Sequence, residues 1–275
     1  MKLKTVPARD GALWVRRGFI VFFRHPMIYT GLFAAFMFLV FVLVMIPLIG
    51  VPLLLAVLPL VSLGFMVATR AVVEGRQPTP AALIEPLRTG KPRLIALVQL
   101  GIAYAAATFC IQWLSDVVDG GALDALLEAL PAGGTTPAAV ADKLSNPQLG
   151  IGLVLRFGLA ALLALPFWHA PALVHWGAQS AGKALFFSTM ACWRNRGAFV
   201  LYVLTWGAVI MVFALLANIV FALLGQAQWV AIASMPASLM FSAIFYASLY
   251  FTFAACFVDD AAAGPAPLAP LPPAA

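Results

Sequence analysis

Charged residues are scarce in this sequence, and two long stretches have none. They make up 9% of the chain, against roughly 25% of a soluble domain. Lys, Arg, Asp and Glu are absent between Arg24 and Arg70, and again between Arg196 and Asp259. A soluble fold could not bury this much apolar surface. Each stretch is long enough for two membrane-spanning helices, because a bilayer core of ~30 Å takes about 20 helical residues.

The residue patterns of common enzymes and cofactor sites are also missing. The three cysteines, Cys110, Cys192 and Cys256, are far apart and form no cluster with metal-ligand spacing. No P-loop, GxSxG, HExxH or paired-carboxylate motif is present. We therefore expect a protein that is not an enzyme and has no cofactor or metal site. The basic residues flank apolar segments and form no patch with interleaved polar and aromatic residues, so we expect no nucleic-acid partner.

What the chain does contain is apolar sequence that predicts a single all-α integral membrane domain over residues 1–260. The expected spans are about 27–48, 52–70, 94–114, 151–174, 198–223 and 229–257. Pro47, Gly50 and Pro52 interrupt the first charge-free stretch, and residues 225–228 interrupt the second, so each stretch is predicted to be a helical hairpin. The tail, residues 261–275, is rich in Ala and Pro, and we expect it to be disordered.

The positions of the basic residues predict how the chain is threaded. With a cytoplasmic N-terminus, fourteen of the sixteen Lys and Arg residues lie on the inner side, the exceptions being Lys143 in an outer loop and Arg156 in a span. Because short cytoplasmic loops carry an excess of Lys and Arg, we expect an inner-membrane protein with both termini in the cytoplasm.

The longest outer segment, residues 116–148, has the opposite character and is acidic. Leu123, Leu126 and Leu127 recur at helical spacing within it, and Thr136-Pro137 is typical of the start of a second short helix. We expect these helices to form a small cap on the outer face.

Basic, aromatic segments precede the first and last predicted hairpins. Their cations are Arg16, Arg17, Arg24, Lys183, Arg194 and Arg196. Apolar residues share one helical stripe in each segment, through Phe19 and Phe22 in the first and Phe186 and Trp193 in the last. Such helices lie in the membrane interface, where their cations meet anionic phospholipid headgroups. A shorter segment after Thr79-Pro80 suggests a three-fold repeat of helix plus hairpin. The alternative is that any basic stretch beside a span has this appearance.

Arg156 is a candidate functional residue, since a charge inside a span is costly to bury. It lies about two turns from the outer end of its predicted helix. Its side chain therefore either reaches the headgroups or makes a structural hydrogen bond, or else it contacts a substrate.

The stretch from Leu165 to Trp176 contains the other candidates, Trp168, His169 and His175. Pro166 and Pro171 predict a kinked or broken helix, and broken helices form binding sites in some transporters. The simpler interpretation is an aromatic belt at the cytoplasmic interface. A second pattern, Ser234, Ser238 and Ser242, predicts a close helix-packing face.

Three segments carry a resemblance to a known family. They are Trp168-His-Ala-Pro-Ala-Leu-Val-His-Trp176, Lys183-Ala-Leu-Phe-Phe-Ser188 and Trp193-Arg-Asn-Arg196. Here the chain resembles a family of six-span proteobacterial inner-membrane proteins, over most of its length to about residue 260. The resemblance implies a fold and a location, and neither an activity nor site residues. More distantly, the plan of basic helix plus hairpin is similar to the membrane region of glycerophosphodiester phosphodiesterases, whose catalytic domain is absent here.

These observations favour a protein that organises lipid or a partner in the membrane through its interfacial helices. The partner would be another membrane protein or a second copy of the chain. The alternative is a small transporter or permease with a path near Arg156 and the Pro166/Pro171 break. A membrane enzyme is the third hypothesis, and no reacting constellation supports it.

Overall fold

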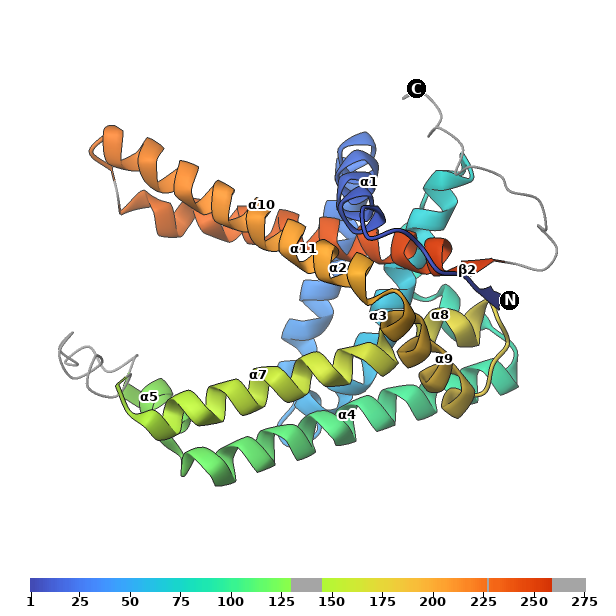
Figure 1. Cartoon of the computed structure of the whole chain (residues 1–275), viewed down its shortest axis with the longest axis horizontal. Coiled ribbons are helices and arrows are strands. Elements are labelled where there is room, and N and C mark those ends of the chain that lie inside the picture. The colour runs from blue at the N-terminus through green and yellow to red at the C-terminus, as the bar shows by residue number, and fades with distance from the viewer. Residues whose placement is uncertain (130–144, 227, 259–275) are drawn as a thin grey trace.

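The computed structural model describes residues 1–129, 145–226 and 228–258 of the 275-residue chain (Figure 1). Its longer helices are α1 (Asp10–Arg24), α2 (Pro26–Val44), α3 (Gly50–Val73), α4 (Lys91–Asp119), α5 (Ala122–Ala129), α7 (Pro147–Phe167), α8 (Ala170–His175), α9 (Ala181–Arg194), α10 (Arg196–Leu223) and α11 (Trp229–Cys256). Two 3-10 turns, η1 (Pro80–Leu83) and η2 (Glu85–Arg88), precede α4, and two short strands, β1 (Lys2–Leu3) and β2 (Phe257–Val258), pair antiparallel.

Within the described residues, six helical segments are able to span a membrane, as the sequence predicts. The helices that are long and apolar enough to cross a membrane are α2, α3, α4, the α7–α8 segment, α10 and α11. They agree with the predicted spans to within a few residues, except that α4 continues through the acidic residues to Asp119. The predicted helix at Leu123 is present as α5. The predicted helix at Thr136-Pro137 and the tail 261–275 lie outside the described residues.

Glycine and proline end the spans where the sequence predicts turns. The residues between α2 and α3 include Pro47 and Leu48. After α10, Gly225 adopts a left-handed conformation, with φ of 66°. There the Gln226 N–H bonds back to the Phe221 carbonyl, which is the Schellman arrangement that commonly closes a helix. The second charge-free stretch is therefore a hairpin of two spans.

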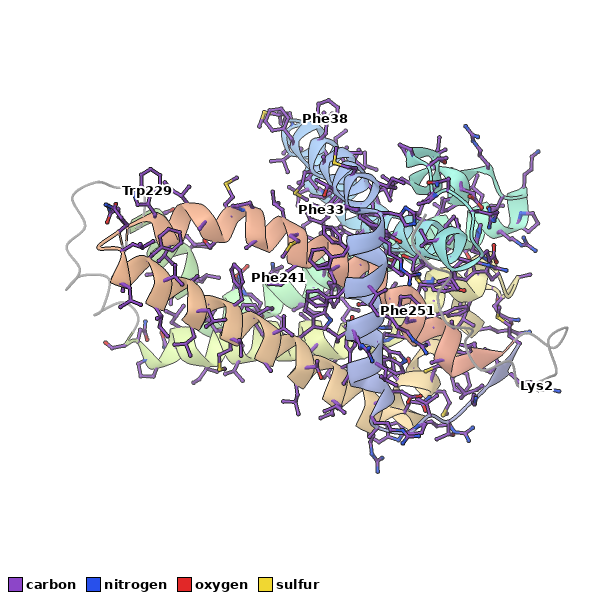
Figure 2. The ribbon with its side chains drawn as sticks, turned by 90° about the horizontal axis from the view of Figure 1, so that it is seen from above. Lys2, Phe33, Phe38, Trp229, Phe241 and Phe251 are labelled. Atoms are coloured by element: carbon purple, nitrogen blue, oxygen red, sulfur yellow. The ribbon has the colours of Figure 1, made fainter. Side chains whose placement is uncertain are left out.

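The three hairpins leave a common base in different directions (Figures 1 and 2). The first two hairpins also touch away from the base, where Gly101 of α4 lies against the backbone of Ala56 in α3 and a Cβ atom would clash. The buried core lies at the base, in α1, the first half of α2, the second half of α3, the first part of α4, α8, α9, and the ends of α10 and α11 nearest the base. Farther out the apolar side chains are exposed, among them Val154, Met211 and Leu223. Exposed apolar surface on this scale marks contact with lipid or protein.

Each short element that precedes a hairpin packs on a different hairpin. Helix α1 precedes α2 and α3 but crosses α10 and α11 (Figure 2). Its Gly11 and Gly18 face Ala198 and Ser248 too closely for a Cβ atom. The turns η1 and η2 precede α4 and pack on α3, while α9 precedes α10 and packs on α7. The contacts therefore run cyclically around the molecule.

The two ends of the described chain meet at the base. Lys2 pairs with Val258 and Leu3 with Phe257, and the Lys4 N–H donates to the Cys256 carbonyl. The buried Asn195, between α9 and α10, accepts from the Val6 N–H at 2.8 Å and donates to the Lys4 carbonyl at 3.0 Å. One amide side chain thus joins the N-terminal segment to the start of the last hairpin.

Candidate functional site

The predicted helix break lies between Phe167 and Ala170, where α7 ends and α8 begins. In an unbroken helix the His169 N–H would bond to the Leu165 carbonyl. Instead, the hydroxyl of Ser188 in α9 accepts from the His169 N–H at 2.9 Å and donates to the Leu165 carbonyl at 2.8 Å. A side chain from a neighbouring helix therefore satisfies two of the backbone groups that the break releases, as non-helical backbone at membrane depth requires.

The break turns Trp168 toward the last hairpin. Its indole N–H donates to the Thr252 hydroxyl of α11 at 3.1 Å. One helical turn earlier in α11, Ser248 lies 2.6 Å from the hydroxyl of Tyr202 in α10. Because Ser248 donates its own proton to the Phe245 carbonyl, Tyr202 is the donor in this pair. These bonds fix the orientation of two large aromatic side chains at the junction of three helices.

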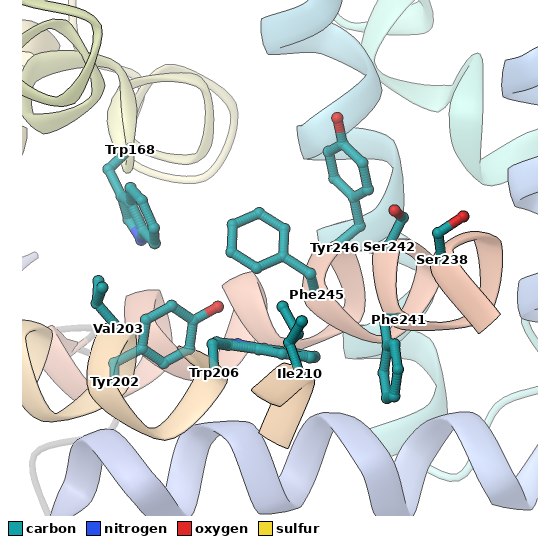
Figure 3. Close-up of a pocket in the computed structure, with 10 residues that line it drawn as sticks. All are labelled: Trp168, Tyr202, Val203, Trp206, Ile210, Ser238, Phe241, Ser242, Phe245 and Tyr246. Carbon is teal, nitrogen blue, oxygen red and sulfur yellow. The ribbon is translucent and has the colours of Figure 1, made fainter. Parts of the chain in front are cut away.

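An aromatic cavity of about 570 Å³ lies beside these bonds (Figure 3). Its lining comes from the α7–α8 junction, α10 and α11: Trp168, Tyr202, Val203, Trp206, Ile210, Ser238, Phe241, Ser242, Phe245 and Tyr246. A smaller cavity of about 190 Å³, next to α3 and α4, shares Trp168, Phe245 and Tyr246 with it. The cavity is thus apolar and aromatic, with three hydroxyl-bearing side chains, Ser238, Ser242 and Tyr246, besides the paired Tyr202.

His169 is fully buried behind Trp168. Its ring contacts Phe199, Phe253 and Phe257, with ring centroids 5.5–5.9 Å apart. Neither ring nitrogen has a hydrogen-bond partner within the described residues. His175 is also buried, at 8% exposure. The interpretation of these two histidines as an interfacial belt is therefore wrong, because protein covers both of them.

Arg156 forms an ion pair at the opposite end of α7. Its guanidinium lies 2.5 Å from a carboxylate oxygen of Asp116 and 3.6 Å from one of Asp119, both in the last turns of α4. Asp119 is buried at 1% exposure, and Gly152 leaves the space for its side chain. Arg156 lines none of the cavities described here. Its contacts are those of the structural hydrogen-bond alternative.

A charged pocket of about 340 Å³, the arginine pocket, lies at the other end of α8. It is lined by Val67, Arg70, Glu74, Arg76, Glu85, Arg93, His175 and Trp176. Glu74 receives hydrogen bonds from both Arg70 and Arg76. Although desolvation alone would raise the pKa of the Glu74 carboxyl, these bonds and the charges of the two arginines hold it below its ordinary value.

The predicted interfacial residues differ between α1 and α9. The apolar face of α1 is covered by α10 and α11, with Trp14, Val15 and Phe22 buried. In α9 the small residues face α7, while Phe186 and Trp193 are exposed beside the exposed Lys183, Arg194 and Arg196. Arg196 also lies 5.8 Å from the Trp193 ring. The exposed apolar stripe expected of an interfacial helix is thus present on α9, whereas on α1 the protein itself covers that stripe.

The remaining features are the potential metal ligands and the serine stripe of α11. Within the described residues, no group of three His, Cys, Asp or Glu side chains is arranged to hold a metal ion. Ser234 and Ser238 are exposed, and each hydroxyl bonds to a carbonyl of its own helix. The predicted packing face is therefore wrong, because these two serines are exposed and are not packed against another described helix; Ser238 lines the aromatic cavity.

Comparison with known proteins supplies the family. The chain is 35% identical over 267 residues to a probable inner membrane protein of Burkholderia thailandensis, and the alignment covers 94% of each chain. This chain belongs to that family of inner-membrane proteins. No family model matches the sequence, and no solved structure matches it. The family relationship and the six apolar helices together make it a multi-pass inner-membrane protein.

The sequence alone identifies some of the residues that line the aromatic cavity and the arginine pocket, and it misses the others. It selected Trp168 and His175, which line the aromatic cavity and the arginine pocket respectively. It missed Tyr202, Trp206 and Phe245, because aromatic residues in a span have no distinguishing spacing until the helices are placed. In the sequence, Arg70 and Arg93 indicate only the orientation of the chain in the membrane. Their convergence depends on how η2 and α4 pack beside α3 and α8.

Proposed function

We propose that this protein is a non-enzymatic inner-membrane protein that organises lipid, with an acyl chain held in the aromatic cavity. The observation that carries the proposal is the position of that cavity. It lies between the α7–α8 break and a hairpin whose outer half exposes apolar side chains to the bilayer. Its volume falls within the range of small-ligand sites. Because the exposed apolar side chains of these helices would face lipid in a bilayer, an acyl chain is the occupant that fits an apolar cavity at this place.

The experiment that tests the proposal fills the cavity. In Ser242→Leu, a larger apolar side chain replaces one of the hydroxyls that line the cavity, so less room is left for an acyl chain. We expect a severalfold loss of the lipid that is retained through mild-detergent purification, measured by native mass spectrometry. The matched control is Ser234→Leu, at an exposed position about two turns earlier in the same helix that does not line the cavity. Equal lipid retention by both variants and the wild type would contradict the proposal.

We further propose that both termini face the cytoplasm. Fourteen of sixteen basic residues lie on that side in this orientation, and the β1–β2 pairing supports a common side for both ends. The cyclic packing of α1, the η1–η2 turns and α9 supports a three-fold repeat of short element plus hairpin. A reporter domain that works only in the cytoplasm should be active when it is fused after residue 260. A reporter that works only outside the cytoplasm should be inactive at the same position.

A permease is the second candidate, and one observation favours it. The broken α7–α8 segment borders both the aromatic cavity and the arginine pocket, through Trp168 and His175. Broken helices of this kind form substrate sites in transporters. Uptake or release of lipid by reconstituted vesicles that depends on Trp168 would favour transport. Retention of lipid without movement across the vesicle membrane would favour the organising role.

A further inference from the structure

The arginine pocket gathers cations from separate parts of the chain. Arg70 comes from the last turn of α3, Arg76 from the segment that follows, and Arg93 from the first turn of α4. Two carboxylates, Glu74 and Glu85, share the pocket, so its formal charge is positive by one before His175 is counted. The positive charges of the three arginines repel one another to the extent that anions do not offset them.

The three arginines differ in whether a carboxylate already neutralises their charge. Arg70 and Arg76 both bond to Glu74, and the Arg70 guanidinium also lies 5.3 Å from the centre of the Trp176 ring. Arg93 makes no ion pair with any carboxylate in the described part of the chain. The Nδ1 atom of the buried His175 likewise has no hydrogen-bond partner among the described residues. Two groups that could bind an anion therefore line the pocket without partners.

The position of Arg93 is also unfavourable for a structural cation. Helix α4 begins Lys91-Pro92-Arg93, with no acidic residue in its first turn. The N-terminal end of a helix carries partial positive charge, which disfavours cations and favours anions. Arg93 lines a second cavity as well, of about 570 Å³, together with Gly90, Gln179 and Ser180. An anion bound beside Arg93 would offset the charge of the side chain and that of the helix end.

We propose that the arginine pocket binds a phosphate group, with Arg93 as the principal cation and Arg76, which already bonds to Glu74, as a weaker second. Guanidinium groups match phosphate oxygens through paired, charge-assisted hydrogen bonds. A phospholipid headgroup and a free phosphate share this chemistry. The headgroup assignment rests on the proposed lipid-organising function, whereas the binding of phosphate itself does not.

The test compares two lipids with the same acyl chains, one with and one without a phosphate-containing headgroup. The full-length protein, delipidated in a neutral detergent, is titrated with dioleoyl phosphatidylglycerol and with dioleoylglycerol, and binding is followed by native mass spectrometry. Arg93→Gln should bind phosphatidylglycerol about tenfold more weakly, the loss expected for one charge-assisted hydrogen bond. Its affinity for dioleoylglycerol should not change. Arg93 is exposed, so the variant should fold.

The matched control is Arg88→Gln, which removes the same charge from an exposed residue five positions away that does not line the pocket. Equal affinity of wild type and Arg93→Gln for phosphatidylglycerol, or an equal loss in Arg88→Gln, would overturn the proposal. Arg76→Gln should show a smaller loss in the same direction. Ser242→Leu distinguishes the two sites, because a lost acyl-chain site lowers the affinity for both lipids.

Inorganic phosphate identifies the source of the ligand. If it raises the thermal unfolding midpoint of the wild type but not of Arg93→Gln, the pocket binds soluble phosphate as well. If it has no effect while phosphatidylglycerol binding depends on Arg93, the ligand is the lipid headgroup. Both outcomes support a phosphate site. A midpoint that rises equally in the wild type, Arg93→Gln and Arg88→Gln would show a general salt effect and count against it.

Discussion

Arg156 shows how far a single residue can be interpreted without its neighbours. The sequence predicts a costly charge in a span and leaves three explanations open. The structure places Asp116 and Asp119 beside it because α4 continues past the predicted end of its span. The ion pair therefore joins the third and fourth spans at their far end. It gives Arg156 a structural role that needs no substrate.

We expect Arg156→Leu to destabilise the protein by about 3 kcal/mol, since it leaves the buried Asp119 without a counter-charge. Asp116 is partly exposed and should contribute little to the loss. The measurement is thermal unfolding in detergent. Arg156→Lys, which keeps the charge, should recover part of the stability. Full stability of Arg156→Leu would mean that the ion pair is not structural.

At the scale of the element, the α7–α8 break depends on a residue from another helix. Pro166 and Pro171 predict the break from sequence alone, because proline cannot maintain the helical hydrogen-bond ladder. The sequence does not reveal that Ser188 compensates for it. Ser188 sits on the small-residue face of α9, and its role appears only when that face packs on α7.

Ser188→Ala removes one hydroxyl, which leaves the His169 N–H without its partner and the Leu165 carbonyl with only the weak bond from the Cys192 thiol. Each unsatisfied buried group costs about 1–3 kcal/mol. We therefore expect a lower unfolding midpoint and weaker lipid retention, since Trp168 is oriented by the same junction. Thr189→Ala is the control, because its exposed hydroxyl bonds only within α9. A midpoint equal to that of the control would exclude the bridging role.

Helix α1 shows what an amphipathic pattern in the sequence cannot predict. A stripe of apolar residues shows that one face is covered, but it does not show whether lipid or protein covers it. The spans themselves are predictable from length and hydropathy, which require no partner. The faces of α1 and α9 are not, because both look alike in sequence and only α1 has its stripe covered by other helices.

At the scale of the whole molecule, the described chain is closed into a ring of contacts by its N-terminal segment. Asn195→Ala should remove the bonds to Val6 and Lys4 and destabilise the protein by about 2 kcal/mol. We also expect faster trypsin cleavage after Lys4 and Arg9, followed by mass spectrometry of the released peptides. Asn218→Ala is the control, since that exposed side chain bonds only within α10. Cleavage at the control rate would mean that Asn195 does not hold the segment.

The cyclic packing has a consequence for how the protein is made. Helix α1 leaves the ribosome first, yet the surface that covers it belongs to α10 and α11, which are synthesised last. Until then Trp14 lacks the rings of Phe199 and Tyr202 that contact it in the folded protein, and it must be shielded by lipid or by the insertion machinery. Domains usually assemble from the N-terminus during synthesis. Here final assembly waits for the last span to enter the bilayer, and a chain truncated before α10 would expose an apolar helix that membrane quality-control proteases could recognise.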